Sequence, residues 1–320
     1  MRQHTIPTPY MVGDVHVYSA EIDGELVLFD TGPGTSEALA VLQKEIDLKR
    51  LKYIFITHGH VDHCGLAAHF AKHSAAEILL PRKDGSKMQY HGERLDHIQA
   101  FLSGYGFDDA FAQQLRGIFR RHRIFPDVPE RFTIVEDSHI PRKLGIRWLN
   151  CPGHSQSDLV YLCGKHAVTG DVLLRNIFQA PLLDVNLETM SGRFRNYDAY
   201  CKTLLELDKL RGYEICPGHR MGIDGIDATI TFYIRKLLER ASQVKKYASA
   251  DSVRELINRL FEDTRGDPFV IFLKVSEVVF MLDFLAAPEK LASSLERIGL
   301  TQAARDARLL TEVQRAGSRS

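Results

Sequence analysis

The sequence predicts a mixed α/β (α+β) protein whose C-terminal part is entirely helical. Three observations lead to this class. Short apolar segments with strand character alternate with helical segments as far as Gly225. One of them, at 52–57, is a continuous apolar run of the kind found in strands that are buried on both faces. From Ile226 onward the residues follow helical spacing alone, which adds a helical segment to the mixed body.

The strands of the mixed part are expected to be short, apolar and bounded by turn residues. They cover 12–20, 25–30, 52–57, 77–80, 132–135, 146–150, 159–162, 167–169 and 213–216. Asp23 and Gly24 lie between the first two, and an Asp-Gly pair between apolar runs is typical of a β-hairpin. Helical spacing is expected over 35–46, 62–73 and 196–210.

Two further regions are expected to be helical. Residues 82–131 lose the strand pattern and form an insert with helices near 96–102 and 108–121. The tail is broken near Asp251, Gly266 and Pro288, where helix-breaking residues gather. We therefore expect two units, a mixed domain over 1–225 that carries the insert and a helical C-terminal domain over 226–320.

Composition argues against several classes of protein. With 41 basic and 41 acidic residues the formal charge is zero, so neither a nucleic acid nor an anionic membrane is an expected partner. No segment approaches the roughly 20 apolar residues of a membrane span, and prolines interrupt the N-terminus where a signal peptide needs an apolar core. The five cysteines form no CxxC pair, which favours a reduced, cytoplasmic protein.

The sequence ITHGHVDHCG directly follows the buried strand and places four candidate metal ligands within six residues: His58, His60, Asp62 and His63. Residues two apart in an extended chain share a face, so His58 and His60 are expected to converge on one ion. Asp62 and His63 lie where a helix begins and can face a second ion. Gly59 is expected to relieve crowding between the ligands. Imidazole and carboxylate are ligands that zinc, manganese and iron accept.

The tetrapeptide Cys-Pro-Gly-His occurs twice, each time after a short apolar strand. Pro-Gly is expected to turn the chain at the strand end, so that His154 and His219 project from that rim as candidate ligands. Cys151 and Cys216 come earlier, on the strand side, where a small buried residue packs well. Asp171 follows another strand and a glycine, and its carboxylate can bridge two cations, one oxygen to each.

The chain resembles the metallo-β-lactamase-fold hydrolases in the order of its motifs, which are HxHxDH, Gly-His, Gly-Asp and a final Gly-His. The Phe-Asp-Thr-Gly sequence at 29–32 also matches that family, in which the aspartate braces the metal loop. The resemblance spans about residues 12–222 and implies a four-layer αββα sandwich with the metals at one edge. It assigns His58, His60 and His154 to the first metal, Asp62, His63 and His219 to the second, and Asp171 to a bridge between them.

The resemblance implies two divalent ions, zinc before iron or manganese, and a hydroxide between them, because coordination lowers the pKa of water toward about 7. Two such ions, two carboxylates and a hydroxide leave a local charge of about +1, which favours an anionic substrate. Asp62 is expected both to bind metal and to orient the hydroxide. The helical tail behind the last ligand resembles that of glyoxalase II. The insert, the HCGL sequence at 63–66 and the tail together also resemble the quinolone-signal-response thioesterases. Both resemblances imply a small thioester, ester or lactone as substrate.

Residues outside the ligand set are expected to choose the substrate. The candidates are polar side chains close to Asp171 or His219 or on the first tail helix: Arg175, Asn176, Arg220 and Tyr233. Each of them can equally be an ordinary solvated surface residue. Asp158, four residues after His154, is a candidate for orienting a ligand through a hydrogen bond.

Two other functions stay open beside the hydrolase of a small-molecule substrate. A phosphodiesterase of the same fold would act on nucleotides or RNA, although the neutral charge disfavours nucleic acid. A ligand-sensing or regulatory protein would keep the metals while its tail contacts a partner or a second copy of the chain. The tail is therefore also a candidate surface for a homodimer.

Overall fold

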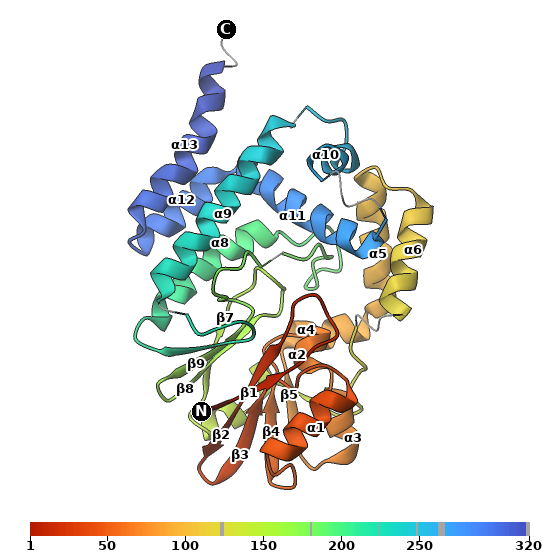
Figure 1. The fold of residues 1–320 in the computed structure, drawn as a ribbon, viewed down its shortest axis with the longest axis vertical. Helices are drawn as coiled ribbons and strands as arrows, with labels where there is room; N and C mark the ends of the chain where they lie inside the picture. The colour runs from red at the N-terminus through yellow and green to blue at the C-terminus, as the bar shows by residue number, and fades with distance from the viewer. Residues whose placement is uncertain (122–124, 180, 224, 248, 262–265, 318–320) are drawn as a thin grey trace.

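The computed structural model describes residues 1–121, 125–179, 181–223, 225–247, 249–261 and 266–317. Two β-sheets lie face to face, helices cover the outer side of each sheet, and further helices extend the second outer layer (Figure 1). This arrangement is the four-layer αββα sandwich with a helical C-terminal extension that the sequence predicts. Within the described ranges, no helix is both long enough and apolar enough to cross a membrane.

The first sheet has six strands in sequence order: β1 (Arg2–Ile6), β2 (Val15–Ile22), β3 (Glu25–Phe29), β4 (Leu51–Phe55), β5 (Glu77–Leu80) and β6 (Thr133–Ile134). The first three pair antiparallel, and β3 to β6 pair parallel. The hairpin between β2 and β3 is confirmed, with positive φ angles of 51° at Asp23 and 82° at Gly24. Strand β1 is not expected from the sequence.

The second sheet has the order β10-β9-β8-β7 and consists of β7 (Arg147–Asn150), β8 (Leu159–Cys163), β9 (His166–Gly170) and β10 (Glu214–Pro217). Strands β7, β8 and β9 pair antiparallel, whereas β10 pairs parallel with β9. The two sheets pack through an aromatic core in which the rings of Phe29, Phe55 and Tyr161 lie 5.3–5.7 Å apart. All four strands fall where the sequence predicts them.

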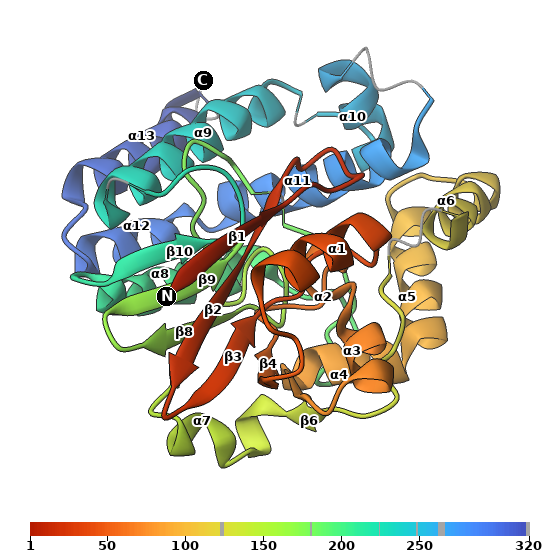
Figure 2. The ribbon, with the colours of Figure 1, turned by 60° about the horizontal axis from the view of Figure 1, so that its bottom comes forward.

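The outer side of the first sheet is covered by α1 (Ser36–Glu45), α2 (Val61–Cys64) and α3 (Ala67–His73) (Figure 2). One continuous helix over 62–73 is wrong, because the chain breaks between α2 and α3. A Cβ atom on Gly65 would lie 2.2 Å from the backbone nitrogen of Gly34, so the two segments meet without side chains. The amide of Leu66 is then held by the hydroxyl of Thr31 at 3.1 Å.

The insert and the connections supply the remaining helices of the mixed part: α4 (Arg82–Gln89), α5 (His91–Gly104), α6 (Asp109–Arg121), η1 (Val135–Asp137), α7 (Ile140–Lys143), α8 (Asn196–Leu207) and η2 (Asp208–Leu210). The helical insert is therefore confirmed in its described residues, although 122–124 lie outside them. Helix α8 covers the outer face of the second sheet, and Leu204 is fully buried there with Val160 of β8.

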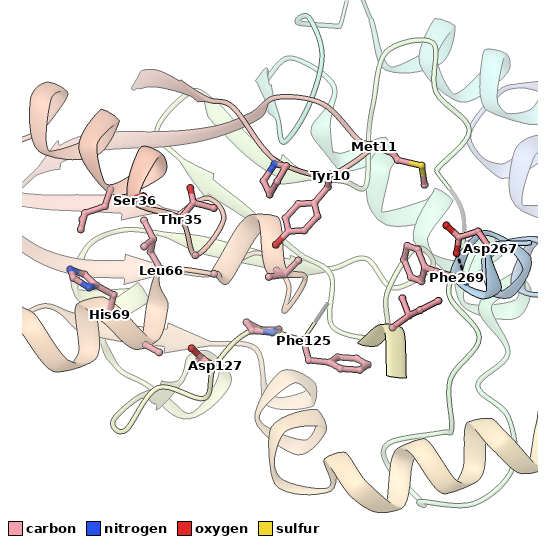
Figure 3. A pocket seen from close by; sticks show the side chains of 18 of the residues that line it. Tyr10, Met11, Thr35, Ser36, Leu66, His69, Phe125, Asp127, Asp267 and Phe269 are labelled. Carbon is pink, nitrogen blue, oxygen red and sulfur yellow. Dashed lines mark hydrogen bonds between the residues drawn. The ribbon is translucent and has the colours of Figure 1, made fainter. Parts of the chain in front are cut away.

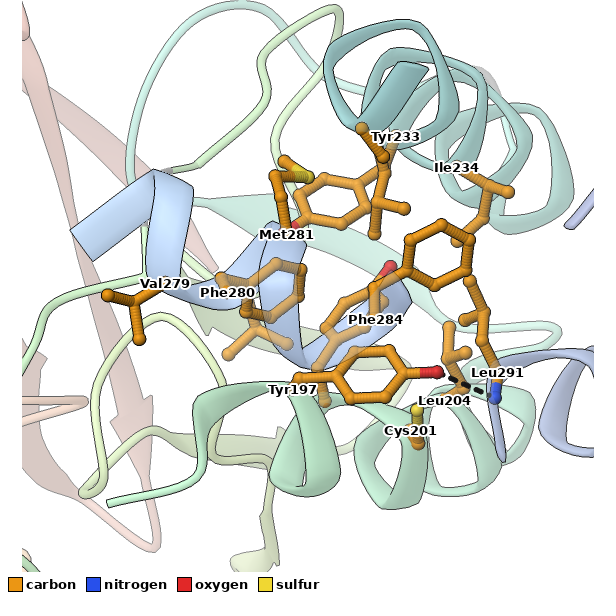
Figure 4. Packing of buried hydrophobic residues seen from close by; sticks show 14 of the residues in the cluster. Tyr197, Cys201, Leu204, Tyr233, Ile234, Val279, Phe280, Met281, Phe284 and Leu291 are labelled. Atoms are coloured by element: carbon orange, nitrogen blue, oxygen red, sulfur yellow. Dashed lines mark hydrogen bonds between the residues drawn. The ribbon is translucent and has the colours of Figure 1, made fainter. Parts of the chain in front are cut away.

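The tail consists of α9 (Ile226–Lys246), α10 (Val253–Leu260), α11 (Pro268–Ala286), α12 (Pro288–Arg297) and α13 (Thr301–Gly317). Helices α11 and α12 pack on α8 around large rings, among them Tyr197, Phe280 and Phe284 (Figure 4). A single hydrophobic cluster therefore contains residues of both expected units. The division at 225 and 226 stays a prediction.

Candidate metal centre

The candidate ligands all follow strand ends at one edge of the sandwich. His58 and His60 follow β4, Asp62 and His63 lie in the short helix α2, and three more residues follow β7, β9 and β10: His154, Asp171 and His219. The end of β10 joins the two sheets there. The Gly218 amide donates to the Gly170 carbonyl at 2.8 Å, and the Gly218 carbonyl accepts from the His16 amide at 2.7 Å. The seven positions predicted from distant parts of the sequence are thus neighbours in space.

Three imidazoles form the first ligand group. His58 Nε2 lies 2.9 Å from His60 Nδ1, and His154 Nε2 lies 3.0 Å from the same His60 nitrogen. The three rings come from two segments almost a hundred positions apart, yet one nitrogen of each lies within 4.8 Å of the others. His58 is buried, and the other two rings are half-buried at a cavity wall.

The second group combines two imidazoles and a carboxylate. His63 Nε2 lies 3.3 Å from His219 Nε2, and His219 Nε2 lies 3.2 Å from Asp62 Oδ2. All three side chains are buried, with His63 fully enclosed. This is the set that the resemblance assigns to the second metal.

Asp171 lies between the two groups and directs a different oxygen toward each. Its Oδ1 is 3.3 Å from His63 Nε2 and 3.6 Å from His219 Nε2, whereas its Oδ2 is 3.6 Å from His154 Nε2. Oδ1 is buried and has no hydrogen-bond partner among the described residues. A buried carboxylate oxygen without a donor is costly, and a cation would satisfy it.

The nitrogen spacings fit divalent ions. Two nitrogens bound at about 2.05 Å to a tetrahedral ion lie about 3.3 Å apart, close to the 2.9–3.3 Å found here. The donor set of imidazoles and carboxylates suits zinc, iron or manganese. The residues present therefore fit a dinuclear centre.

The second ring nitrogen of several ligands is held by an orienting partner. His63 Nδ1 lies 2.8 Å from Asp30 Oδ2, and His219 Nδ1 lies 2.7 Å from the Asp14 carbonyl oxygen. His58 Nδ1 lies 3.1 Å from the hydroxyl of Thr57. Such contacts fix the ring orientation and leave Nε2 to face the centre.

The pKa values of histidines shift in opposite directions in the two ligand groups. Burial, followed by the nearby imidazole of His63, lowers the pKa of His58 well below its usual value, so that ring is neutral. Burial also lowers the pKa of His63, but the carboxylates Asp171 and Asp62 outweigh it and raise that pKa well above the usual value. Because an imidazole must lose its proton to bind a metal, ion binding by the second group weakens as pH falls.

The insert contributes a buried polar network beside the first ligand group. The sequence does not predict this network. Asp84 on α4 is 1% exposed, and a Cβ atom on Gly59 would lie 2.6 Å from its Oδ1. Gly59 therefore makes room for Asp84, which corrects the expectation that it relieves crowding between ligands. Lys87 Nζ lies 2.9 Å from Asp84 Oδ1 and donates to the hydroxyls of Ser155 at 2.6 Å and Ser157 at 2.9 Å.

This network ties the insert to the turn that carries His154. Asp158 caps the same turn, because its Oδ2 accepts from the Ser155 amide at 2.7 Å. The predicted hydrogen bond from Asp158 to a ligand is replaced by this backbone contact. Asp84 lies four residues after the end of β5, inside α4, where no short sequence pattern marks it as part of the site.

Replacing Lys87 by methionine should weaken ion binding by the first group about 10–100-fold, as loss of an orienting partner usually does. Asp84 would remain as a buried carboxylate without its cation, so the free energy of unfolding should also fall by about 3–5 kcal/mol. Metal titration and chemical unfolding measure the two effects. Lys83→Met on the same helix is the control, since Lys83 pairs with Glu188, which is 69% exposed, and this pair is worth under about 1 kcal/mol. Equal behaviour of both variants would contradict the role of Lys87.

The cysteines of the two Cys-Pro-Gly-His segments belong to no ligand group in the described residues. Both are buried, and burial raises the thiol pKa of Cys151 well above its usual value and that of Cys216 to about 11. A protonated thiol is a poor metal ligand. The structure therefore agrees with their predicted role as packed wall residues.

Cys151→Ala and Cys216→Ala should consequently retain the metal content of the unmodified protein. Each loses only packing, so the free energy of unfolding should fall by about 1 kcal/mol. Elemental analysis of the purified variants measures the metal content, and thermal unfolding measures the cost. Loss of one metal equivalent in either variant would make that cysteine a ligand.

The four candidate substrate-binding residues are placed differently. Arg220 lies next to His219, is exposed, and lines a cavity that opens on the centre. The described residues that line this cavity do not include Arg175 or the exposed Asn176. The Nη1 atom of Arg175 instead lies 3.4 Å from the Gly222 carbonyl oxygen. Tyr233 needs correction, because it is 5% exposed and its ring packs in the core, 4.4 Å from the ring of Phe178 and 4.7 Å from that of Tyr200 (Figure 4).

Two facing sheets with convergent histidines and aspartates at one edge define the class of αββα metal-dependent hydrolases. The sequence profile described as the metallo-beta-lactamase superfamily matches residues 10–219, and the chain belongs to that superfamily. No curated protein matches the chain significantly. The family and the ligand groups together indicate a metal-dependent hydrolase.

Solved structures agree on the fold. A metallo-beta-lactamase family protein from Thermus thermophilus is 20% identical, covers 89% of this chain and 92% of its own, and gives a TM-score of 0.65. A beta-lactamase domain protein from Burkholderia ambifaria is 17% identical, covers 89% of this chain and 86% of its own, and gives a TM-score of 0.70. At these identities the likeness is one of fold.

Proposed function

We propose that this protein is a dinuclear metal-dependent hydrolase of a small thioester, ester or lactone. The observation that carries the proposal is the placement of Asp171, whose two oxygens face two separate ligand groups. In this proposal His58, His60 and His154 hold one divalent ion, Asp62, His63 and His219 hold the other, and Asp171 bridges them. Zinc is the proposed metal, since imidazole and carboxylate donors at these spacings suit it.

When bound, the two ions supply Lewis acidity that lowers the pKa of water toward about 7 and stabilises negative charge. The protein side chains then orient the reactants. Asp62 belongs to the second ligand group and also lines the cavity, so we assign it the positioning of the attacking water as well. Arg220 lies at the same wall and is suited to an anionic group of the substrate.

The overall reaction needs no protein nucleophile. The oxygen of water bonds to the carbonyl carbon, and the bond from that carbon to sulfur or oxygen breaks. A thioester gives a carboxylate, a thiol and a proton. A thiol is a good leaving group, so a thioester needs less help from a general acid than an alkyl ester does.

A substrate panel tests the proposal. The protein, loaded with zinc, iron or manganese in turn, is assayed with acetyl thioesters, lactones and bis-p-nitrophenyl phosphate. We expect turnover of thioesters or lactones that is lost on chelation and restored by metal. Turnover of the phosphodiester alone would replace the proposal by a phosphodiesterase, and no turnover with any metal would replace it by a metal-containing regulatory protein.

A further inference from the structure

A cavity of about 940 Å³ begins at the candidate metal centre and extends away from it. One end of the cavity is formed by five of the candidate ligands: His60, Asp62, His154, Asp171 and His219. The walls beyond them come from the insert helices α4, α5 and α6, the segment after β9, and the tail helix α11. The volume lies near the upper end of the range for small-molecule sites.

Many of the residues that line the cavity beyond the ligands are apolar. They include aliphatic and aromatic side chains from these elements: Leu95, Ile98, Phe119, Leu182, Leu183, Phe272 and Leu273. Ile98 and Leu183 are 3% exposed, Phe272 is 4% exposed, and Phe119 is 5% exposed, so these walls are fixed in the core. A substrate group with many hydrogen-bonding atoms would leave them unpaired against such walls.

Several charged side chains that line the cavity are paired within its wall. Arg94 Nε lies 2.8 and 2.9 Å from the two carboxylate oxygens of Asp184, and its guanidinium lies over the ring of Phe125 at 5.1 Å. Lys87 is paired with Asp84 in the same way. The paired part of the wall therefore offers little net charge for a second anionic group, whereas the exposed Arg120 and Arg220 also line the cavity and keep their charge accessible to solvent.

A separate groove of about 1190 Å³ shares several wall residues with this cavity, among them Tyr10, Met11, Phe125 and Phe269. Figure 3 shows Tyr10, from the loop between β1 and β2, pointing into the groove. The groove runs past α1 and α3 and does not include the candidate ligands among its described lining. The cavity is consequently the space that a reacting carbonyl at the centre would use.

The geometry points to an acyl substrate with an uncharged, apolar body of medium length, which occupies the cavity between the insert and α11 while its carbonyl lies at the metal centre. This inference rests on the proposed hydrolase and adds the substrate class. The insert helices and α11 then act as the specificity-determining walls. Small or peptide-like acyl groups would fill the cavity poorly.

A chain-length series tests the inference on the metal-loaded protein. N-acetylcysteamine thioesters from acetyl to octanoyl share one leaving group and differ only in the acyl body. We expect kcat/KM to rise by about fourfold per added methylene until the cavity is filled, the gain of burying a methylene group. A flat profile, or one that falls from acetyl onward, would overturn the inference.

Leu273→Trp should shorten the preferred chain. Leu273 lines the cavity on α11 and does not belong to the hydrophobic clusters of the described residues, so an indole at this position projects into the cavity volume. The ratio of octanoyl to acetyl kcat/KM should fall at least about tenfold. Leu309→Trp is the matched control, because Leu309 is 57% exposed on α13 and should leave this ratio as it is. Equal ratios in both variants would contradict the assignment.

Binding of octanoate and acetate, measured by calorimetry, separates this inference from the proposed function. Octanoate should bind the metal-loaded protein more tightly than acetate does, and Leu273→Trp should remove that difference. If no thioester is hydrolysed but this pattern holds, the hydrolase proposal fails and the apolar acyl site stands. If thioesters are hydrolysed but octanoate binds no better than acetate, the acyl site fails and the hydrolase stands.

Discussion

Asp171→Asn should leave the protein with about one bound ion in place of two and lower kcat/KM at least about 100-fold. Loss of an orienting partner alone typically costs 10–100-fold, so the loss of a shared ligand should exceed that range. The physical reason is that Asp171 faces both groups, with Oδ1 3.3 Å from His63 and Oδ2 3.6 Å from His154. An asparagine has one acceptor oxygen and no charge, and therefore cannot serve two cations.

Metal content and steady-state kinetics measure the two effects, and thermal unfolding shows that the variant is folded. Asp306→Asn is the control, since Asp306 is exposed on α13 and its hydrogen bond among the described residues is a local one, from the amide of Gln302. It should keep both ions and full activity. Two bound ions and undiminished turnover in Asp171→Asn would remove the bridging role from the account.

Asp30→Asn should weaken ion binding by the second group about 10–100-fold and lower the free energy of unfolding by about 1–3 kcal/mol. Asp30 is 1% exposed and accepts three contacts, from the Thr57 amide at 2.7 Å, the Thr57 hydroxyl at 2.8 Å and His63 Nδ1 at 2.8 Å. An asparagine must turn its amide nitrogen either toward the Thr57 amide or toward the Thr57 hydroxyl and His63 Nδ1. In either orientation at least one buried donor beside the ligands loses its acceptor.

Asp23→Asn controls for backbone effects in this experiment. Both aspartates have positive φ angles, 61° at Asp30 and 51° at Asp23, and asparagine tolerates this conformation as well as aspartate does. Asp23 lies in the hairpin between β2 and β3, away from the centre. Metal titration and unfolding should therefore separate the two variants clearly, and equal results would show that Asp30 does not brace His63.

The ligand positions were predictable because each carries a local signal. Most of the candidate ligands follow a strand end, and an apolar strand followed by glycine and then histidine or aspartate is visible in a few residues, as at His154 or Asp171. Strand β1 lacked such a signal, since four of its five residues are polar and its place depends on pairing with β2. The break at Gly65 likewise depends on Gly34, which lies far away in sequence.

The surroundings of the centre were harder to predict because they depend on how separate segments pack. Tyr233 has the polar hydroxyl of a binding residue, but the register of α9 turns its ring into the core beside Tyr200. Lys87 and Asp84 look like solvated helix residues in sequence, and only the approach of α4 to the turn after His154 buries them. Long-range packing of this kind leaves no short pattern.

A crystal structure of the metal-loaded protein, with anomalous scattering recorded at the absorption edge of the bound metal, tests the central claim most directly. Two peaks are expected, one among His58, His60 and His154 and one among Asp62, His63 and His219, with Asp171 between them. The absence of a peak at these side chains, or a single peak that does not contact Asp171, would contradict the dinuclear centre on which the proposed chemistry depends.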